Sequence, residues 1–283
     1  MPFLGAHVST AGGVCSSLDR AEKIQCEAMQ IFAKNNKCWL DRPMDEQEAA
    51  RFRKGSSVFP KGFVVSHAGY LINLAAGDED IHRKSVESML DEMTRAESLG
   101  IRWVVLHPGS HGGRGEEWGI PRVIHSLQTV LDRTKSFKAG ILIETTAGQG
   151  NALGWKFEHI AEIRRALKPS RRVGVCVDTC HIFAAGYELR TREGYDSTIR
   201  ALDALIGIKN VKLFHLNDSL KGLGSRVDRH EHIGRGEIGL DGFRFLMNDR
   251  RFSNLPMVLE TPKGPDMKED VINLKTLKGL IRR

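Results

Sequence analysis

Eight short apolar runs recur along the chain, and a polar residue closes each of them. None exceeds seven residues, and they are rich in Val, Ile, Leu and Phe, which is typical of strands buried on both faces. The closing residues are 27 to 45 positions apart, which leaves room for one strand, one loop and one helix per unit. The runs are 3-FLGAH-7, 28-AMQIFAK-34, 62-GFVVSH-67, 101-IRWVVLH-107, 139-AGILIE-144, 173-VGVCVD-178, 211-VKLFH-215 and 256-PMVLE-260.

The segments between the runs carry apolar residues at helical spacing. Stripes of the i, i+3, i+4, i+7 type run through residues 16–25, 85–100, 119–134, 157–167, 198–206 and 268–282. Eight strand–helix units predict an α/β fold, an eight-stranded parallel (β/α)8 TIM barrel with its helices outside. A doubly wound open sheet would carry a glycine fingerprint after its first strand, and GAHVSTAGG is not one. No linker or composition break interrupts the pattern, so residues 1–283 are predicted to form a single TIM-barrel catalytic domain.

Composition adds three constraints. No charged-then-apolar leader and no 18-residue apolar run is present, so we expect a cytoplasmic protein that does not enter the membrane. The five cysteines form no CxxC pair and are interpreted as free thiols, with Cys176 or Cys180 as a minor candidate for a metal ligand. A formal charge of +7 favours a polyanionic partner.

The polar residues that close the runs suggest a metal centre. The strand ends of such a barrel converge on one mouth, where active sites lie. Imidazoles and carboxylates gathered there are most simply held by divalent cations, zinc first and manganese second. Seven of the eight closing residues are His, Asp or Glu, the exception being Lys34: they are His7, His67, His107, Glu144, Asp178, His215 and Glu260.

Two further segments enlarge this donor set. His181 follows the sixth run in 178-DTCH-181, and 225-SRVDRHEHIG-234 places Asp228, His230 and His232 on alternate residues, hence on one side of an extended chain. The total exceeds what one ion requires, so several ions are expected. A polymetal mouth in a basic protein points to phosphodiester hydrolysis. The residues alone leave open how many of the three alternating side chains are ligands.

The spaced motifs GAHVSTAGG, SHAGYLINL, LHPGSH, IETTAGQG, VGVCVDTCHIFAAGY, LFHLNDS, GSRVDRHEHIG and VLETP cover nearly the whole chain. In these motifs the chain resembles the endonuclease IV family, the zinc-dependent apurinic/apyrimidinic endonucleases of base-excision repair. The resemblance implies three zinc ions. His67, His107 and Glu144 would hold one; Glu144, Asp178, His215 and Glu260 a second; His181, Asp228 and His230 the third. His232 would be a bystander near the site.

The resemblance also implies the reaction. The enzyme would hydrolyse the phosphodiester bond 5′ to an abasic site in duplex DNA by a trinuclear zinc mechanism, leaving a 3′-hydroxyl and a 5′-deoxyribose phosphate. Glu144 and Glu260 would act catalytically through the metals, and Mn²⁺ is the alternative ion at one or more sites. We further expect 3′-repair diesterase and phosphatase activity and a monomeric protein.

Candidate DNA contacts lie on three loops. The resemblance implies that Tyr70 and Leu71 insert at the lesion, together with Lys37, where many family members have Arg. Lys lacks the planar guanidinium that stacks on bases, so Lys37 is expected to contact phosphate instead. A rim of basic residues is predicted to follow the DNA backbone: Lys34, Lys37, Arg226, Arg229 and Arg235.

Two other functions remain open at this stage. A divalent-metal sugar isomerase or epimerase on the same barrel would need only the set Glu144, Asp178, His215 and Glu260, and one or two ions. A non-enzymatic nucleic-acid-binding protein would keep its DNA affinity after chelation and would not nick. Metal stoichiometry and nicking separate the three alternatives.

Overall fold

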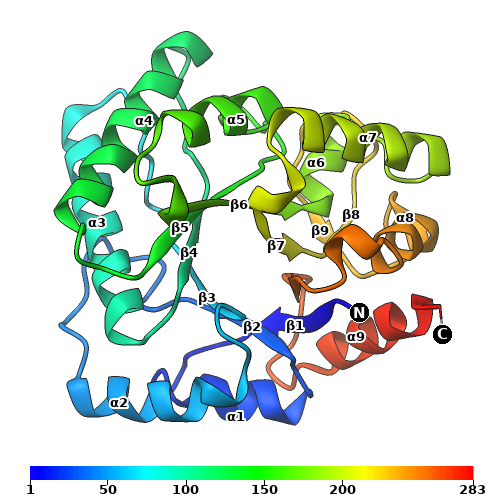
Figure 1. Ribbon diagram of the computed structural model, residues 1–283, viewed down its shortest axis with the longest axis horizontal. Helices are drawn as coiled ribbons and strands as arrows, with labels where there is room; N and C mark the ends of the chain where they lie inside the picture. The colour runs from blue at the N-terminus through cyan, green and yellow to red at the C-terminus, as the bar shows by residue number, and fades with distance from the viewer. Residues whose placement is uncertain (283) are drawn as a thin grey trace.

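The computed structural model describes residues 1–282 and shows a closed parallel barrel surrounded by helices (Figure 1). Strands neighbour one another in the order β1-β10-β7-β6-β5-β4-β3-β2, so the chain advances strand by strand around the barrel and β10 closes it against β1. The predicted eight-stranded parallel barrel is confirmed. The barrel strands are β1 Phe3–His7, β2 Ala28–Ile31, β3 Val64–His67, β4 Trp103–Leu106, β5 Gly140–Glu144, β6 Val173–Asp178, β7 Val211–His215 and β10 Pro256–Leu259.

Helices cover the outside of the barrel, and each predicted stripe overlaps one of them. Three of the helices that the structure describes, α2, α6 and α8, were not predicted. No described helix is both long and apolar enough to cross a membrane. The α-helices are α1 Ser16–Lys23, α2 Glu46–Gly55, α3 Glu79–Ser98, α4 Glu116–Arg133, α5 Phe157–Ala166, α6 Thr179–Ala185, α7 Arg192–Leu205, α8 Gly239–Met247 and α9 Lys268–Leu280, and short 3₁₀ turns η1 Ser56–Val58, η2 Ser170–Arg172, η3 Ile208–Asn210 and η4 Arg250–Phe252 precede strands.

Inside the barrel, an apolar layer supports a polar one. Seven buried residues, one from each strand except β1, pack together in the barrel interior: Ala28, Val65, Val105, Leu142, Cys176, Leu213 and Val258. Side chains two positions apart in a strand point to the same side, so the residue two further on also faces inward, one level closer to the mouth. That second level is Gln30, His67, His107, Glu144, Asp178, His215 and Glu260.

Strand β1 contributes Gly5 and then His7 to the same two levels. A Cβ on Gly5 would lie 1.6 Å from the carbonyl oxygen of Ala28, so no larger residue fits where β1 and β2 approach each other. His7 is paired in register with Gln30. Beyond the barrel strands, β8 Asp218–Ser219 and β9 His230–Glu231 form a small antiparallel sheet. This sheet closes the loop between β7 and α8 over the mouth.

Candidate metal centre

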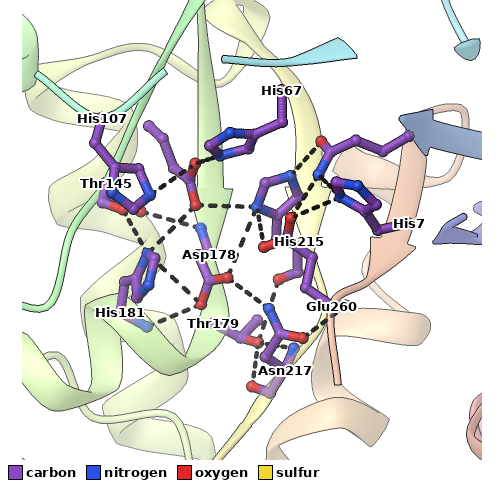
Figure 2. A network of polar contacts seen from close by, with 12 residues as sticks. His7, His67, His107, Thr145, Asp178, Thr179, His181, His215, Asn217 and Glu260 are labelled. Carbon is purple, nitrogen blue, oxygen red and sulfur yellow. Dashed lines mark hydrogen bonds and ion pairs between the residues drawn. The ribbon is translucent and has the colours of Figure 1, made fainter. Parts of the chain in front are cut away.

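Glu144 lies at the centre of the polar level. Its Oε2 is 3.0 Å from Nε2 of His67 and 3.2 Å from Nε2 of His107, and its Oε1 is 2.9 Å from Nδ1 of His215. The carboxylate is fully buried, and the imidazoles around it point toward one another (Figure 2). One carboxylate therefore has donor atoms from β3, β4 and β7 within direct reach.

A second set of donor atoms surrounds Nδ1 of His215. Glu260 Oε2 lies 3.2 Å from that nitrogen and Asp178 Oδ2 lies 3.8 Å from it. Asp178 also caps α6, since its Oδ1 accepts the N–H of His181 at 2.9 Å. One oxygen of Asp178 thus begins the helix while the other faces the cluster. The structure brings Glu144, Asp178, His215 and Glu260 into one compact group.

A third set is nearer to solvent. Asp228 bridges two imidazoles, with its Oδ2 at 3.1 Å from Nε2 of His181 and its Oδ1 at 3.4 Å from Nε2 of His230. The two ring nitrogens are 3.5 Å apart. The nine predicted ligands therefore converge at the mouth, and their distances allow the three sets that the family resemblance implies.

The imidazole rings are oriented by oxygens that can only accept hydrogen bonds. Nδ1 of His67 lies 2.8 Å from the carbonyl of Ala68, and Nδ1 of His181 lies 2.8 Å from the carbonyl of Thr145. A ring nitrogen facing a carbonyl must carry the proton, so Nε2 is left facing the cluster. In the same way, His230 directs Nδ1 at the carbonyl of Glu260.

His215 is oriented by a side chain instead of the backbone. Its Nε2 lies 2.8 Å from Oε1 of Gln30, which leaves Nδ1 facing Glu144 and Glu260. Histidines that bind a metal usually place their second nitrogen against such an oxygen, which fixes the tautomer and the ring plane. Four of the five imidazoles in this donor set have that arrangement, so the residues present fit divalent cations.

The charges of the cluster are strongly coupled. Burial alone would raise the pKa of the Glu144 and Glu260 carboxyls, but His215 and the other imidazoles beside them hold both pKa values well below the ordinary range. Burial would lower the pKa of His181, yet Asp178 and Asp228 raise it well above the ordinary value. Against the same effect of burial, the Glu260 and Glu144 carboxylates raise the pKa of His215 well above the ordinary value. The Glu144 and Glu260 carboxyls are therefore ionised at neutral pH, as metal ligands must be.

Comparison with known proteins places this geometry in a family. The family model described as a xylose isomerase-like TIM barrel matches residues 18–277. A probable endonuclease 4 of Chloroflexus aurantiacus is 50% identical over 285 residues, which span 100% of this chain and 99% of that protein. The chain belongs to the endonuclease IV family. The predictions of a hydrolytic enzyme of the endonuclease IV type and of a role in the repair of abasic sites in DNA are confirmed.

Comparison with solved structures supports the same family assignment. Endonuclease IV from Thermus thermophilus superposes with a TM-score of 0.86 at 37% identity, over 99% of this chain and 98% of that one. A D-tagatose 3-epimerase-like protein superposes with a TM-score of 0.71 at 19% identity, over 98% of each chain, a likeness that shows the fold alone. The barrel is thus shared with the D-tagatose 3-epimerase-like protein, whereas the higher sequence identity is with endonuclease IV.

Three residues beside the centre of this endonuclease IV family member were assigned to no ion from the sequence, and two of them, Gln30 and Asn217, were not recognised at all. Gln30 Nε2 lies 2.9 Å from Nδ1 of His7 and also donates to Glu260. Asn217 donates its amide to Asp178 Oδ2 at 2.6 Å, and its Oδ1 accepts the N–H of Glu260 at 2.8 Å. His7 was noted as a strand end and lies 3.4 Å from Glu260. Gln30 was detectable because it is a polar residue in the middle of the apolar run 28-AMQIFAK-34.

Three candidate ligands from the sequence are not members of the three sets: His232, Cys176 and Cys180. His232 directs Nδ1 at the amide of Asn273 in α9, 3.1 Å away, and is in none of the ligand groups of the described residues. Cys176 and Cys180 do lie beside the ligands, but burial raises the pKa of each thiol to about 12. Either thiol would therefore have to lose a tightly held proton before it could bind a metal.

The residues predicted to contact DNA lie on loops around the mouth. Tyr70 and Leu71, after β3, are exposed although both are largely apolar, and Tyr70 packs edge-on against Phe32 at 5.4 Å. Lys37 is exposed on the loop after β2. Arg226 and Arg229 are on the loop that carries Asp228, and the guanidinium of Arg226 lies 3.5 Å from the centre of the Trp155 ring.

Lys34 does not belong to that rim, and its prediction as a phosphate contact is wrong. Strand β2 ends at Ile31, and the Lys34 side chain, three residues on, extends to α3. Its side chain is only 1% exposed, with Nζ at 3.0 Å from Asp91 Oδ2 and 3.6 Å from Glu92 Oε1, both in α3. The lysine is a buried structural cation because these two acidic residues of α3 surround it.

Proposed function

We propose that this endonuclease cleaves the phosphodiester bond on the 5′ side of an abasic site in duplex DNA, with three zinc ions at the barrel mouth, and leaves a 3′-hydroxyl and a 5′-deoxyribose phosphate. One observation carries the proposal, the division of nine convergent donor side chains into three compact groups. His67, His107 and Glu144 would hold the first ion; Glu144, Asp178, His215 and Glu260 the second; His181, Asp228 and His230 the third.

The charge of the donor set suits an anionic substrate. Three divalent cations would exceed the charge of the four carboxylates by two, because the imidazole ligands are neutral when they coordinate. Bound there, the ions supply positive charge and Lewis acidity next to the scissile phosphate. The mixture of imidazole and carboxylate favours zinc, with Mn²⁺ as an alternative at one or more sites.

Backbone carbonyls and side chains around the ligands would hold the ions in fixed positions. Glu144 is shared between two sets and would fix the spacing of the first two ions. We therefore assign Glu144 a catalytic role through the metals. We assign the same kind of role to Glu260, which belongs to the second set. The carbonyls of Ala68 and Thr145 hold the rings of His67 and His181, and Gln30 holds that of His215. A site fixed in this way needs little reorganisation when the phosphate arrives.

The loops around the mouth supply lesion recognition. Tyr70 and Leu71 expose apolar surface, as side chains that wedge between bases must. A cavity of about 450 Å³ lies between Tyr70, Phe32, His7, His230 and Glu260, directly beside the third set. An abasic nucleotide has lost its stacking and pairing, so moving it out of the duplex costs less than moving an intact one. We propose that this cavity receives it.

The basic residues of the rim are proposed to bind the DNA backbone, with Lys37, Arg226 and Arg229 each contacting phosphate. We also propose that the same site removes 3′-phosphates and 3′-phosphodiesters, because these groups present the same phosphorus–oxygen bond to the ions. The protein is proposed to act as a monomer.

A nicking assay tests the proposal. A duplex with one synthetic abasic site is incubated with enzyme as purified and with enzyme after prolonged chelation, and metal content is measured in parallel. We expect a nick on the 5′ side with a 3′-hydroxyl, loss of nicking on chelation and about three zinc ions per chain. One or two ions without nicking would favour the sugar isomerase. DNA binding that survives chelation, without nicking, would favour a binding protein.

A further inference from the structure

The segment 234-GRGEIG-239 has the G-x-G-x-x-G spacing with which backbone N–H groups often surround a phosphate. In the structure these N–H groups surround an internal anion, the carboxylate of Asp218. Its Oδ2 accepts the N–H groups of Gly234 at 2.9 Å, Gly236 at 3.1 Å and Gly239 at 3.3 Å. Its Oδ1 accepts that of Ile238 at 2.9 Å and, within its own turn, that of Ser219 at 2.8 Å. Asp218 is fully buried.

The glycines permit this approach of backbone to carboxylate. A Cβ on Gly236 would lie 2.4 Å from the carbonyl oxygen of Ser219 and 2.6 Å from Oδ1 of Asp218, so only glycine fits there. Gly234 and Gly239 have φ values of 78° and 70°, which side chains rarely adopt. The motif is therefore built around the Asp218 carboxylate.

Asp218 also begins the loop that carries the third ligand set. Strand β8 pairs with β9 so that Ser219 lies opposite His230, and the N–H of Leu220 donates to the carbonyl of Arg229 at 2.9 Å. The N–H of Glu237 donates to the carbonyl of Ser219 at 2.7 Å. The chain entering the loop at β8 is thus bound on one side to β9 and on the other to the glycine segment.

We propose that Asp218 is a positioning residue for the third cation. It contacts no ligand side chain of the three sets. It fixes the base of the loop, and so the places of Asp228 and His230, by holding the glycine segment against β8. In Asp218→Asn one carboxylate oxygen is replaced by an NH₂ group. Backbone N–H groups that now donate to that oxygen would lose their acceptor and face another donor. The proposal rests on the proposed function because it concerns the third of the three ions.

Three variants test it. Asp218→Asn removes the charge at nearly constant volume. Gly239→Ala is a milder change, since open space surrounds its Cβ and only the positive φ is strained. Asp45→Asn is the control, because Asp45 also accepts a backbone N–H, from Glu48, but caps α2 far along the chain from the loop.

Two measurements separate positioning from general stability. In competition with a chromogenic chelator, the unaltered protein should hold three zinc ions, whereas Asp218→Asn should release one of the three with affinity reduced about 10- to 100-fold and retain two. Gly239→Ala should show the same pattern with a smaller change, and Asp45→Asn none. In metal-free protein, hydrogen exchange of the amides of Gly234, Gly236 and Ile238 should accelerate in Asp218→Asn but not in Asp45→Asn.

The outcomes distinguish the two proposals. If the unaltered protein holds three ions and Asp218→Asn holds them equally tightly, the role of Asp218 is overturned and the proposed function stands. If the unaltered protein never holds a third ion, both fall together. Should Asp218→Asn fail to fold, Gly239→Ala decides, and unchanged release of all three ions from that variant overturns the inference.

Discussion

Glu144 Oε1 lies 2.9 Å from Nδ1 of His215, although the two residues are 71 positions apart in the chain. They end β5 and β7, and β6 stands between these strands in the barrel. The side chains meet because inward-facing residues at one level of a small barrel converge on its axis. The other oxygen of Glu144 faces His67 and His107, so this carboxylate joins two groups of ligands that no single strand pair could supply.

Glu144→Gln is predicted to reduce nicking of abasic DNA by at least about 100-fold, on the scale of losing one well-placed electrostatic group in an active site. The amide keeps the shape of the side chain but removes the charge between the first two ion sets. Single-turnover nicking measures the loss, with zinc content in parallel. Glu46→Gln is the control, because Glu46 is highly exposed and lies in α2. Near-normal nicking by Glu144→Gln would remove Glu144 from the centre.

Zinc binding to metal-free protein is predicted to release protons at pH 7. The pKa values of His181 and His215 are raised well above the ordinary 6.5, so both rings are protonated before the ion arrives and must lose a proton to coordinate. As pH falls the ion competes with more protons and zinc affinity decreases; as pH rises through the raised pKa values the release diminishes. Calorimetric titration in buffers of different ionisation enthalpy counts the protons, and a buffer-independent enthalpy at pH 7 would contradict this account.

Lys34→Met is predicted to destabilise the protein by about 3–5 kcal/mol, the usual result of removing one partner from a buried ion pair. Glu92, whose side chain is 1% exposed, would lose its cation, and its Oε2 already has no hydrogen-bond partner among the described residues. Urea unfolding measures the change. Lys37→Met is the matched control, since Lys37 is exposed and its loss should alter stability by less than about 0.5 kcal/mol. Equal stability of the two variants would contradict the role of Lys34 as a structural cation.

Replacing Arg226 and Arg229 together by Ala is predicted to make DNA binding less dependent on salt. Each lost phosphate contact should reduce the slope of log K against log salt by about 0.9. Binding of uncleaved duplex to metal-free protein at several salt concentrations measures the slope. Arg171 and Arg250 form the control pair, since both are exposed but precede β6 and β10, at the end of the barrel opposite the mouth. If the control pair changes the slope as much, the rim has been misplaced.

The barrel and the polar strand ends that converge inside it could be predicted because both follow from strand periodicity. A strand buried on both faces leaves an uninterrupted apolar run, and a polar residue at its end stands out in the sequence. Helices α2 and α6 were missed for opposite reasons. Only Ala49 and Phe52 of α2 are buried, which is too few for a stripe, and α6 is buried on almost every side, which leaves no polar face to define one.

The supporting residues of the site could not be predicted in the same way. Lys34 was placed at the mouth because β2 was expected to extend to it, and its partners in α3 are more than 50 residues away. The bonds of Asn217 to Asp178 and Glu260 depend on how β6, β7 and β10 come together, which no local pattern records. The glycine segment 234–239 was likewise invisible as a binding site for Asp218 until the fold brought them together.

The central claim is that the nine convergent side chains hold three cations, two of which share Glu144. Crystals grown with zinc and measured on either side of its absorption edge locate every zinc ion directly. The account predicts three anomalous peaks at the mouth, two flanking Glu144 and one between His181, Asp228 and His230. A single peak, or peaks that leave Glu144 without a zinc neighbour, would contradict it.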